Sequence, residues 1–341
     1  MKIFEQLVRE KEGKKVRIYL FYSLFLDSVT PLADVDRKVV FDYLFLMLVS
    51  KIEIPEAKLF RRGKVRDVFD LGENLLLVST DRLSAFDYVL PSLIPCKGTV
   101  LNSLALFWFN RFSREFPNHV VTGDVDLYPA PFRDHKDLLR GRSVLVRKLK
   151  PLPFEIIVRG YISGSGWNSY RENGTISGIS VPPGMTESEA FPQPLFTPTT
   201  KADEGHDEPT TYEALVEAIG AKRASRIRET ALELYRQARV YAEEKGIILA
   251  DTKFEMAFDG DEPILVDEIF TPDSSRFWKR DGYKAGRGQE SLDKQYVRNY
   301  LLSSSWDRKS PPPPLPDSVV KETSRIYQSI FQTLTGSDPG C

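Results

Sequence analysis

The sequence predicts an α+β fold, with antiparallel strands and long helices in separate stretches of the chain. Two observations indicate the strands: in residues 247–278 and again in residues 58–80, apolar runs flank a short turn of polar residues and glycine. This pattern is typical of a β-hairpin. A third observation indicates the helices, because residues 210–245 and 317–334 repeat apolar side chains three and four positions apart.

The composition is that of an ordinary globular protein. The chain has 341 residues, of which 41% are hydrophobic and 28% charged, enough for two domains with a large core. The formal net charge of −1 gives no overall attraction to nucleic acid or to an anionic membrane. The two cysteines, Cys96 and Cys341, form no disulfide framework or zinc pattern, so we expect a reducing compartment, the cytoplasm.

Residues 1–50 differ in character from the rest and are expected to form an N-terminal extension whose order the sequence does not define. Their two apolar runs, residues 18–26 and 39–49, are each too short to cross a bilayer as a helix. Acidic residues precede the first run, which disfavours a signal peptide. The segment has no cluster of phosphate-binding or metal-binding residues, so we expect it to be dispensable for catalysis.

The hairpin in residues 58–80 carries the first candidate binding residues. Gly63 precedes Lys64 and Arg66, which are expected on one strand face. A glycine lets the backbone approach a phosphate, and the two cations would lie along it. A solvated basic edge is the alternative interpretation. The segment TDRLSAFD, residues 80–87, follows the second strand directly and is expected to line a site.

The middle of the chain contains two further strands on either side of a predicted domain boundary. Residues 144–149 and 155–158 have the composition of strands, and the prolines between them mark the boundary. Arg159 ends the second strand, and Gly-Ser-Gly follows at residues 164–166. The backbone N–H groups and the Ser165 hydroxyl of such a segment can hold an anion, whereas a tight turn is the alternative interpretation.

Residues 171–208 are predicted to be mostly loop, because prolines recur along them. Within this stretch, FTPTTKADEGHDE places Lys201, His206 and Asp207 on one long connection. Long loops of enzymes often close over substrates, and a disordered surface loop is the alternative interpretation.

The first strand of the hairpin in residues 247–278 carries three charged candidates. Its side chains alternate between two faces, so Asp251, Lys253 and Glu255 share one of them. Charged side chains in a strand that is otherwise apolar need partners, because unpaired buried charge is costly. A structural network of lysine and carboxylate pairs would satisfy them.

The second strand of the same hairpin, predicted over residues 264–269, carries Asp267 and Glu268 inside an apolar run. A Mg²⁺ ion bridged to phosphate oxygens would supply a partner for one carboxylate from each strand. The hairpin therefore predicts either a magnesium site or the structural network described above.

Six sequence blocks, taken in order, closely resemble the signature blocks of the SAICAR synthetase family, the phosphoribosylaminoimidazole-succinocarboxamide synthases. The blocks are RGKVRDVFD, TDRLSAFD, PFEIIVRGYISGSGW, FTPTTKADEGHDE, ADTKFE and VDEIFTPDSSRFW. The resemblance covers residues 56–336 and is to the single-chain monomeric form of the family. The family's RGKVRD block normally lies close to the N-terminus, whereas here residues 1–55 precede the similar region.

The resemblance implies an ATP-dependent ligase of purine biosynthesis, with ATP and Mg²⁺ as cofactors. ATP, L-aspartate and the carboxylated aminoimidazole ribonucleotide, CAIR, would give SAICAR, ADP and phosphate. Because oxide is a poor leaving group, the CAIR carboxylate would first be phosphorylated to an acyl phosphate, which the aspartate amine then attacks. Such chemistry needs positioned cations and Mg²⁺-binding carboxylates rather than a Ser/His/Asp triad.

The resemblance also implies roles for individual residues. The residues at the ATP phosphates or beside the nucleotide would be Gly63, Lys64, Arg66, Lys253 and Glu255. The magnesium ligands would be Glu255 and Asp267. The CAIR phosphate or carboxylate would be bound by Arg159, Ser165 and Arg276, with Asp273 facing the imidazole. The pocket near the aspartate amine would be lined by Asp81, Ser84 and Asp87. The implied catalytic residues are Lys64, Lys201, Asp207 and Lys253, of which Lys201 and Asp207 belong to the closing loop.

We expect the chain to act as a monomer and to be organised in four segments. They are the extension (residues 1–50), an antiparallel-sheet domain acting as a nucleotide lid (51–150), a larger sheet-and-helix domain that binds substrate and metal (151–310), and a Pro-rich spacer with a C-terminal helix (311–341). The expected partners are the small molecules CAIR and L-aspartate, with no nucleic acid and no membrane.

Two other classes of protein are also compatible with the sequence. A small-molecule kinase of the inositol phosphate kinase type shares the D-x-K pattern of Asp251 and Lys253. A nucleotide-binding protein without catalytic activity is the other, although intact Lys64, Glu255 and Asp267 argue against it. A ligase needs aspartate to release ADP, whereas a kinase does not.

Overall fold

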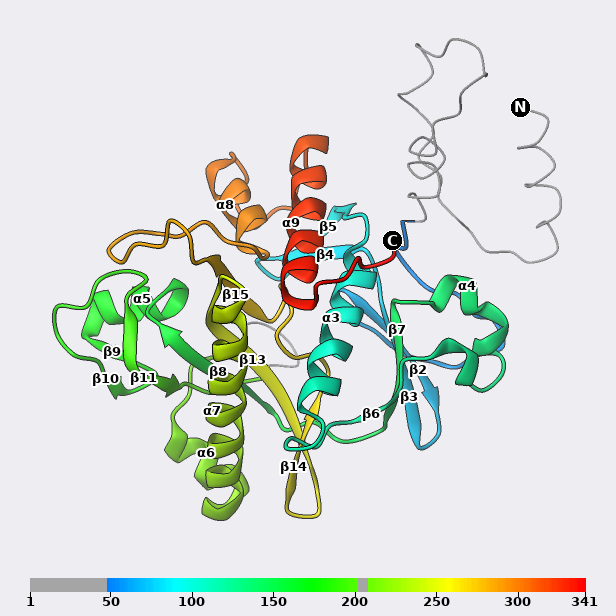
Figure 1. Ribbon diagram of the computed structural model, residues 1–341, viewed down its shortest axis with the longest axis horizontal. Helices are drawn as coiled ribbons and strands as arrows, with labels where there is room; N and C mark the ends of the chain where they lie inside the picture. The colour runs from blue at the N-terminus through cyan, green and yellow to red at the C-terminus, as the bar shows by residue number, and fades with distance from the viewer. Residues whose placement is uncertain (1–47, 202–207) are drawn as a thin grey trace, which may run out of the picture.

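A computed structural model of the chain describes residues 48–201 and 208–341. It confirms the predicted α+β class, because two antiparallel sheets, of five and six strands, are covered by helices (Figure 1). Most of the predicted N-terminal extension lies outside the described residues, as do His206 and Asp207.

The first sheet has the strand order β1-β2-β3-β7-β6, and each neighbouring pair is antiparallel. Its strands are Leu59–Arg62 (β1), Arg66–Leu71 (β2), Asn74–Ser79 (β3), Val120–Thr122 (β6) and Ser143–Arg147 (β7). Phe69, Leu76 and Val78 are buried, so one face of this sheet contributes to an apolar core of its own. Lys64 lies in the turn between β1 and β2 rather than on a strand face, whereas Arg66 begins β2.

The second sheet is built around β13, Ile247–Asp259, which pairs with three other strands. Its order is β11-β8-β13-β14, with β12 added to β8 and β15 added to β13. These strands are Phe154–Tyr161 (β8), Ala190–Phe196 (β11), Thr199–Thr200 (β12), Glu262–Val266 (β14) and Ser275–Lys279 (β15). Thr252, Phe254 and Met256 are buried, so the alternation predicted along β13 is confirmed.

Two small hairpins complete the strands. They are Arg82–Ala85 (β4) with Tyr88–Leu93 (β5), and Thr175–Ile176 (β9) with Ile179–Ser180 (β10). At the tip of the first hairpin, Phe86 and Asp87 have φ values of 50° and 65°. Residues other than glycine rarely adopt this left-handed conformation, and such positions cluster at functional sites.

Helices cover the second sheet and link the two sheets, and three of them match the two helical segments predicted above. The α-helices are Lys97–Phe112 (α3), Lys136–Leu139 (α4), Gly164–Asn173 (α5), Tyr212–Ile219 (α6), Ala221–Glu244 (α7), Gln295–Ser303 (α8) and Asp317–Thr335 (α9), and two 3-10 turns are Val125–Leu127 (η1) and Phe132–His135 (η2). α7 packs on β8, β13 and β14, while α3 contacts both the first sheet and α9 (Figure 1). Over residues 48–201 and 208–341, no helix has both the length and the apolar character needed to cross a bilayer.

Three predicted segments differ from the structure. The second strand of the long hairpin ends at Val266, because Asp267 has a left-handed φ of 66° and leads the chain out of the sheet. Residues 275–279, for which no strand is predicted above, form β15 against β13. Residues 171–208, expected to be mostly loop, contain β11, which pairs only with β8 among the described strands and is therefore an edge strand. Such a strand tolerates prolines, because a residue on its open side does not have to donate a backbone hydrogen bond to a neighbouring strand.

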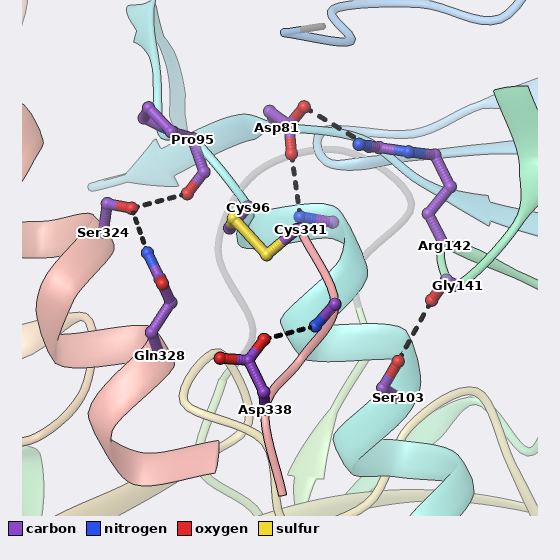
Figure 2. Close-up of a disulfide and its surroundings, with 12 residues drawn as sticks. Asp81, Pro95, Cys96, Ser103, Gly141, Arg142, Ser324, Gln328, Asp338 and Cys341 are labelled. Atoms are coloured by element: carbon purple, nitrogen blue, oxygen red, sulfur yellow. Dashed lines mark hydrogen bonds and ion pairs between the residues drawn. A yellow bond between two sulfur atoms is a disulfide. The ribbon is translucent and has the colours of Figure 1, made fainter. Parts of the chain in front are cut away.

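Cys96 and Cys341 are joined by a disulfide, with Cα atoms 5.6 Å apart (Figure 2). The prediction that the cysteines make no disulfide framework is therefore wrong for this pair. Cys96 immediately precedes α3, and Cys341 follows α9. The Ser324 hydroxyl of α9 also donates a 2.8 Å hydrogen bond to the Pro95 carbonyl. The start of α3 is thus tied to the α9 segment by a covalent bond and a hydrogen bond.

Candidate active site

Strand register assembles a cluster of two arginines around Asp251. On β13, Asp251 lies opposite Arg159 of β8 and opposite Arg276 of β15. The Asp251 Oδ2 atom accepts hydrogen bonds from Arg159 Nη1, at 3.3 Å, and from Arg276 Nη1. Arg159 also donates to the Ser165 hydroxyl at 3.4 Å, and Arg276 to the Ser163 hydroxyl at 3.0 Å. Two guanidinium groups share one carboxylate, so the cluster keeps a net positive charge.

The two-arginine cluster has the properties of an anion site. Burial lowers the pKa of Arg159, and the neighbouring charge of Arg276 lowers it further, although Asp251 opposes both. Residues 164–166 begin α5, so the first N–H groups of a helix lie beside the arginines, as in many phosphate sites. Gly164 is required there, because a Cβ atom would lie 2.5 Å from Arg276 Nη2 and φ is +53°.

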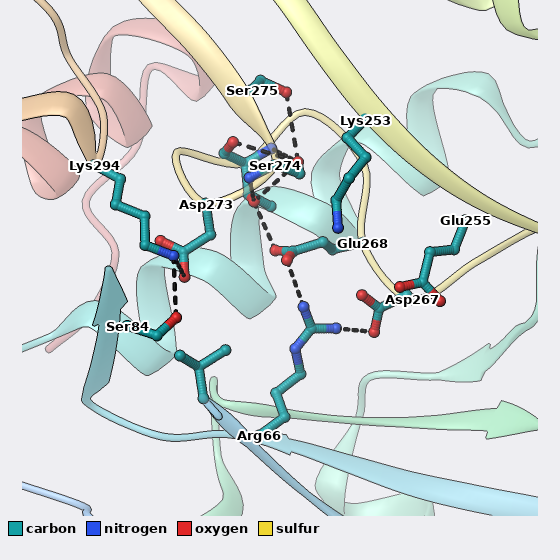
Figure 3. A network of polar contacts seen from close by, with 12 residues as sticks. Arg66, Ser84, Lys253, Glu255, Asp267, Glu268, Asp273, Ser274, Ser275 and Lys294 are labelled. Atoms are coloured by element: carbon teal, nitrogen blue, oxygen red, sulfur yellow. Dashed lines mark hydrogen bonds and ion pairs between the residues drawn. The ribbon is translucent and has the colours of Figure 1, made fainter. Parts of the chain in front are cut away.

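A second cluster lies further along the same face of β13 (Figure 3). Glu255 pairs with Val266, so the next residue, Asp267, leaves β14 beside it. Arg66 of the first sheet reaches across and donates to both Asp267 and Glu268 through its two terminal nitrogens. Burial raises the pKa of Asp267 and the negative charge of Glu255 raises it further, while Arg66 opposes the shift.

Two lysines complete the second cluster. Lys201 donates to Glu255 Oε2, and Lys253 donates to Glu155 Oε1. Burial alone would lower the pKa of Lys253, but Glu155 and then Glu255 raise it above its ordinary value. The cluster therefore alternates positive and negative groups along one wall, an arrangement suited to charged phosphate groups.

Glu255 and Asp267 fit a Mg²⁺ ion that is shared with a nucleotide. Magnesium is usually bound by one or two protein carboxylates, with phosphate and water oxygens supplying the rest. Nowhere in the described part of the chain do three or more metal-ligating side chains gather. The donor set is thus too small for a fully protein-ligated ion but adequate for an ion that arrives with phosphates.

A third cluster is centred on Asp273 and includes Lys97, the first residue of α3. Lys97 Nζ lies 2.8 Å from Asp273 Oδ2, and the Tyr327 hydroxyl donates to Oδ1 at 2.6 Å. Lys294 Nζ lies 3.7 Å from Oδ2. Burial would raise the pKa of Asp273, but Lys294 and Lys97 hold it well below its usual range. Both oxygens of the carboxylate are occupied by protein donors.

The turn between β1 and β2 presents Lys64 close to the β4–β5 hairpin. Lys64 Nζ lies 2.6 Å from Asp87 Oδ1, and both side chains are about half exposed. The buried Arg82 donates 3.0 Å hydrogen bonds to the carbonyls of Gly63 and Lys64. Arg82 therefore fixes the turn that carries the Lys64 ammonium.

Like Asp273, Asp81 has a carboxylate that is already occupied by protein groups. It is buried and accepts from the N–H groups of Val49, at 2.8 Å, and Gly98, at 2.9 Å, and it pairs with Arg142. Arg82 also donates to the Ser50 carbonyl. Val49 and Ser50, which were predicted to belong to the extension, are thus bonded to the body of the protein.

The structure brings most of the predicted residues into three clusters. Lys64 and Asp87 pair with each other in a separate place, Asp81 is bonded to the body of the protein, and Asp207 lies outside the described residues. Sequence reasoning missed several of their partners, which are Arg82, Lys97, Glu155, Ser163, Lys294 and Tyr327. Glu155 stands in the apolar run FEIIV, so a charge inside a strand was its available signal. Arg159 lies within β8 rather than at its end, which places it opposite Asp251.

Together, the cationic turn, the carboxylate pair and the separate two-arginine site are suited to binding phosphorylated, anionic small molecules. The family model of SAICAR synthetase matches residues 59–313, more than half of the chain. The chain belongs to the SAICAR synthetase family. This assignment does not favour the small-molecule kinase considered above.

The sequence is similar to known members of this family over almost their whole length. The phosphoribosylaminoimidazole-succinocarboxamide synthase of Thermodesulfovibrio yellowstonii is 48% identical over 288 residues, 84% of this chain and 99% of its own. That of Pelobacter propionicus is 49% identical over 289 residues, 84% of this chain and 98% of its own.

Solved structures resemble the fold as well. The SAICAR synthase from Saccharomyces cerevisiae, complexed with SAICAR, matches with a TM-score of 0.78 at 41% identity, covering 85% of this chain and 99% of the other. A SAICAR synthetase described as in complex with ADP has a TM-score of 0.61 at 24% identity, covering 84% of this chain and all of its own, and supports the fold alone.

Proposed function

We propose that this protein joins L-aspartate to the carboxylate of CAIR, forming SAICAR, ADP and phosphate in purine biosynthesis, and that the three clusters divide the substrates among them. The reaction transfers the γ-phosphoryl group of ATP to a CAIR carboxylate oxygen. The aspartate amine then attacks the acyl carbon, the C–O bond to phosphate breaks, and the amine loses a proton.

One observation carries the assignment of roles: Asp251, Lys253 and Glu255 lie on one face of β13. Four residues of strand span about 13 Å, so the two-arginine site and the carboxylate pair stand at the two ends of one surface. CAIR has a phosphate at one end and a carboxylate at the other. It can therefore lie along β13 with its phosphate at Arg159 and Arg276 and its carboxylate toward Glu255.

The nucleotide would occupy the other side of the carboxylate pair. Lys64 and Arg66 would face the ATP phosphates, and Glu255 with Asp267 would hold Mg²⁺, which neutralises charge on the transferring phosphoryl group when it is bound. Arg66 and Lys201 already neutralise these carboxylates and would have to share them. Lys253, kept charged by Glu155, would face the acyl phosphate.

We propose further features that follow from the same organisation. The boundary near residue 151 is supported by the connectivity, because β7 ends the first sheet in sequence and β8 begins the second. We also propose that the protein acts as a monomer and that it is located in the cytoplasm. Sedimentation at micromolar concentration tests the monomer directly.

The proposed activity is tested by ADP release from ATP and CAIR, with and without L-aspartate, with SAICAR measured in the same samples. We expect ADP and SAICAR to form in equal amounts and only when aspartate is present. Equally fast ADP release without aspartate would instead favour a kinase. No ADP release under either condition would contradict catalysis altogether.

A further inference from the structure

The strand β13 contains a β-bulge directly before Asp251. In its pairing with β15, Leu249 lies opposite Phe277. The next pair along the ladder is Asp251 opposite Arg276. Two steps on β13 thus correspond to one step on β15, and Ala250 is the extra residue. A bulge of this kind interrupts the alternation of side chains and can re-aim a residue beside a functional site.

The bulge decides which face of the sheet Asp251 occupies. Before it, Leu249 lies in the same apolar core as the buried side chains of α7, whereas Ala250 lies in a separate apolar cluster with Trp278. In a regular strand, residues two apart share a face, so Asp251 would follow Leu249 into that core. The bulge instead places Ala250 and Asp251 on the same face, where Asp251 meets Arg276.

The two-arginine cluster depends on this placement. Asp251 Oδ2 is the shared acceptor for Arg159 and Arg276, which come from the strands on either side of β13. Within the described residues, Asp251 and Arg159 form the last pair of the ladder between β8 and β13. The two residues of β13 just before Asp251 are therefore outside this ladder, and their position needs another support.

Tyr235 of α7 supplies this support. The helix packs on β8 and β13 (Figure 1), and the Tyr235 side chain is completely buried. Its hydroxyl donates a 2.6 Å hydrogen bond to the Leu249 carbonyl and lies 3.4 Å from the Ala250 carbonyl. Burial raises the pKa of Tyr235 well above its ordinary value, although Arg239 opposes the shift, so the hydroxyl keeps the proton that it donates.

Gly160 leaves the space that the Tyr235 ring needs. A Cβ atom at Gly160 would overlap the Tyr235 hydroxyl and would lie 2.9 Å from its Cζ atom. Side chains alternate along a strand, so the ring approaches β8 from the face opposite to the Arg159 side chain. Tyr235 therefore contacts the backbone next to both Arg159 and Asp251 from the far side of the sheet, where it cannot touch a ligand bound by the arginines.

We propose that Tyr235 is a positioning residue of the two-arginine site, and that it acts through the bulge at Ala250. Its hydroxyl fixes the bulge, the bulge aims Asp251, and Asp251 holds both guanidinium groups for the phosphate of CAIR. The inference rests on the proposed function for the identity of this ligand. Glu255 lies four residues beyond the bulge, about 13 Å along the strand, so the effect should be confined to CAIR.

The test compares kcat and the KM values for all three substrates in Tyr235→Phe and in a matched control, Tyr241→Phe. Tyr241 lies on the same helix, and its hydroxyl donates a 2.7 Å hydrogen bond to the Leu334 carbonyl of α9. Both variants thus lose one tyrosine hydrogen bond to a backbone carbonyl, but only one of these bonds is at the bulge.

In Tyr235→Phe, we expect the KM for CAIR to rise about 3- to 10-fold, the equivalent of one hydrogen bond. The KM values for ATP and aspartate should change less than about twofold, because their proposed sites are distant from the bulge. At saturating CAIR, kcat should stay near the wild-type value. Tyr241→Phe should leave all three KM values unchanged.

Ribose 5-phosphate, which carries a phosphate group but no imidazole, gives a readout independent of turnover. Its affinity, measured by calorimetry, should fall by the same factor in Tyr235→Phe and should not change in Tyr241→Phe. Gly160→Ala should also weaken its binding, because the new Cβ atom displaces the hydroxyl. The double variant Gly160→Ala/Tyr235→Phe should bind no more weakly than Gly160→Ala alone, since the overlapping hydroxyl is gone.

Each outcome decides the inference. Equal affinity for ribose 5-phosphate in Tyr235→Phe and wild type would overturn it, as would equal increases in all three KM values or the same losses in Tyr241→Phe. If Gly160→Ala does not fold, the comparison of the two phenylalanine variants decides alone. Selective loss of ribose 5-phosphate binding in Tyr235→Phe, with a wild type that makes no SAICAR, would support the inference and contradict the proposed function.

Discussion

Replacing Asp251 by Asn should destabilise the protein yet strengthen its binding of phosphate. The Asp251 carboxylate is the shared partner of Arg159 and Arg276, and the three side chains are only 11%, 10% and 17% exposed. Asn keeps the shape and a hydrogen-bond acceptor but removes the negative charge. Two buried guanidinium groups would then face each other without a counterion.

The expected loss follows from burial. Removing one partner from a buried ion pair costs about 3–5 kcal/mol; because these side chains keep some exposure and Arg159 keeps Ser165, we expect about 3 kcal/mol. Asp259→Asn is the matched control, since Asp259 lies on the same strand with a side chain 60% exposed and pairs with an exposed arginine. Exposed pairs contribute about 0–1 kcal/mol.

The assay is urea unfolding of both variants with and without ribose 5-phosphate, chosen because it carries the phosphate group without the imidazole. A ligand at 100 times its Kd stabilises a protein by about 2.7 kcal/mol. Without the competing carboxylate, Asp251→Asn should bind the phosphate more tightly than wild type does. Saturating ribose 5-phosphate should therefore reduce the difference in free energy of unfolding between wild type and Asp251→Asn. Unchanged stability, or weaker phosphate binding than in wild type, would refute the anion site.

Three further predictions follow from the other clusters. Glu255→Gln or Asp267→Asn should lower kcat by at least about 10²-fold through loss of charge stabilisation; near-normal turnover at millimolar Mg²⁺ would contradict the assignment. Lys201→Ala, which frees Glu255, should raise the ratio of ADP to SAICAR, measured in one assay, because water then competes with the amine; an unchanged ratio with wild-type kcat would exclude this role. A reductant should lower the free energy of unfolding of oxidised wild type by about 2–4 kcal/mol, because the disulfide spans a sequence separation of 245 residues. The same reductant should leave the free energy of unfolding of Cys341→Ser unchanged. Two free thiols in the oxidised, denatured wild type would disprove the bond.

Local patterns were sufficient to predict the elements and one face of the site. Periodicity located α6, α7 and α9 and both hairpins, because a 3.6-residue or two-residue repeat is visible within one segment. The same alternation placed Asp251, Lys253 and Glu255 together, and the structure confirms that they share a face of β13.

Contacts between distant segments could not be predicted in this way. Arg66 meets Asp267 across 201 residues of sequence, and Lys294 meets Ser84 across 210. Neither contact leaves a local pattern, since it depends on how the two sheets and α3 pack. The end of β14 was missed for a related reason: the apolar run continues through Ile269, while the left-handed backbone at Asp267 turns the chain away. A carboxylate in that position gains Arg66 as a partner, which the sequence alone does not reveal.

The most direct measurement of the proposed chemistry follows oxygen from CAIR labelled with ¹⁸O in its carboxylate. Transfer of a phosphoryl group to that carboxylate, followed by amine attack at the acyl carbon, moves one carboxylate oxygen into inorganic phosphate. We therefore expect the label in phosphate, in proportion to the SAICAR formed. If SAICAR forms while the phosphate carries no label, carboxylate activation by phosphorylation is wrong, and with it the roles given to Lys201, Lys253 and the carboxylate pair.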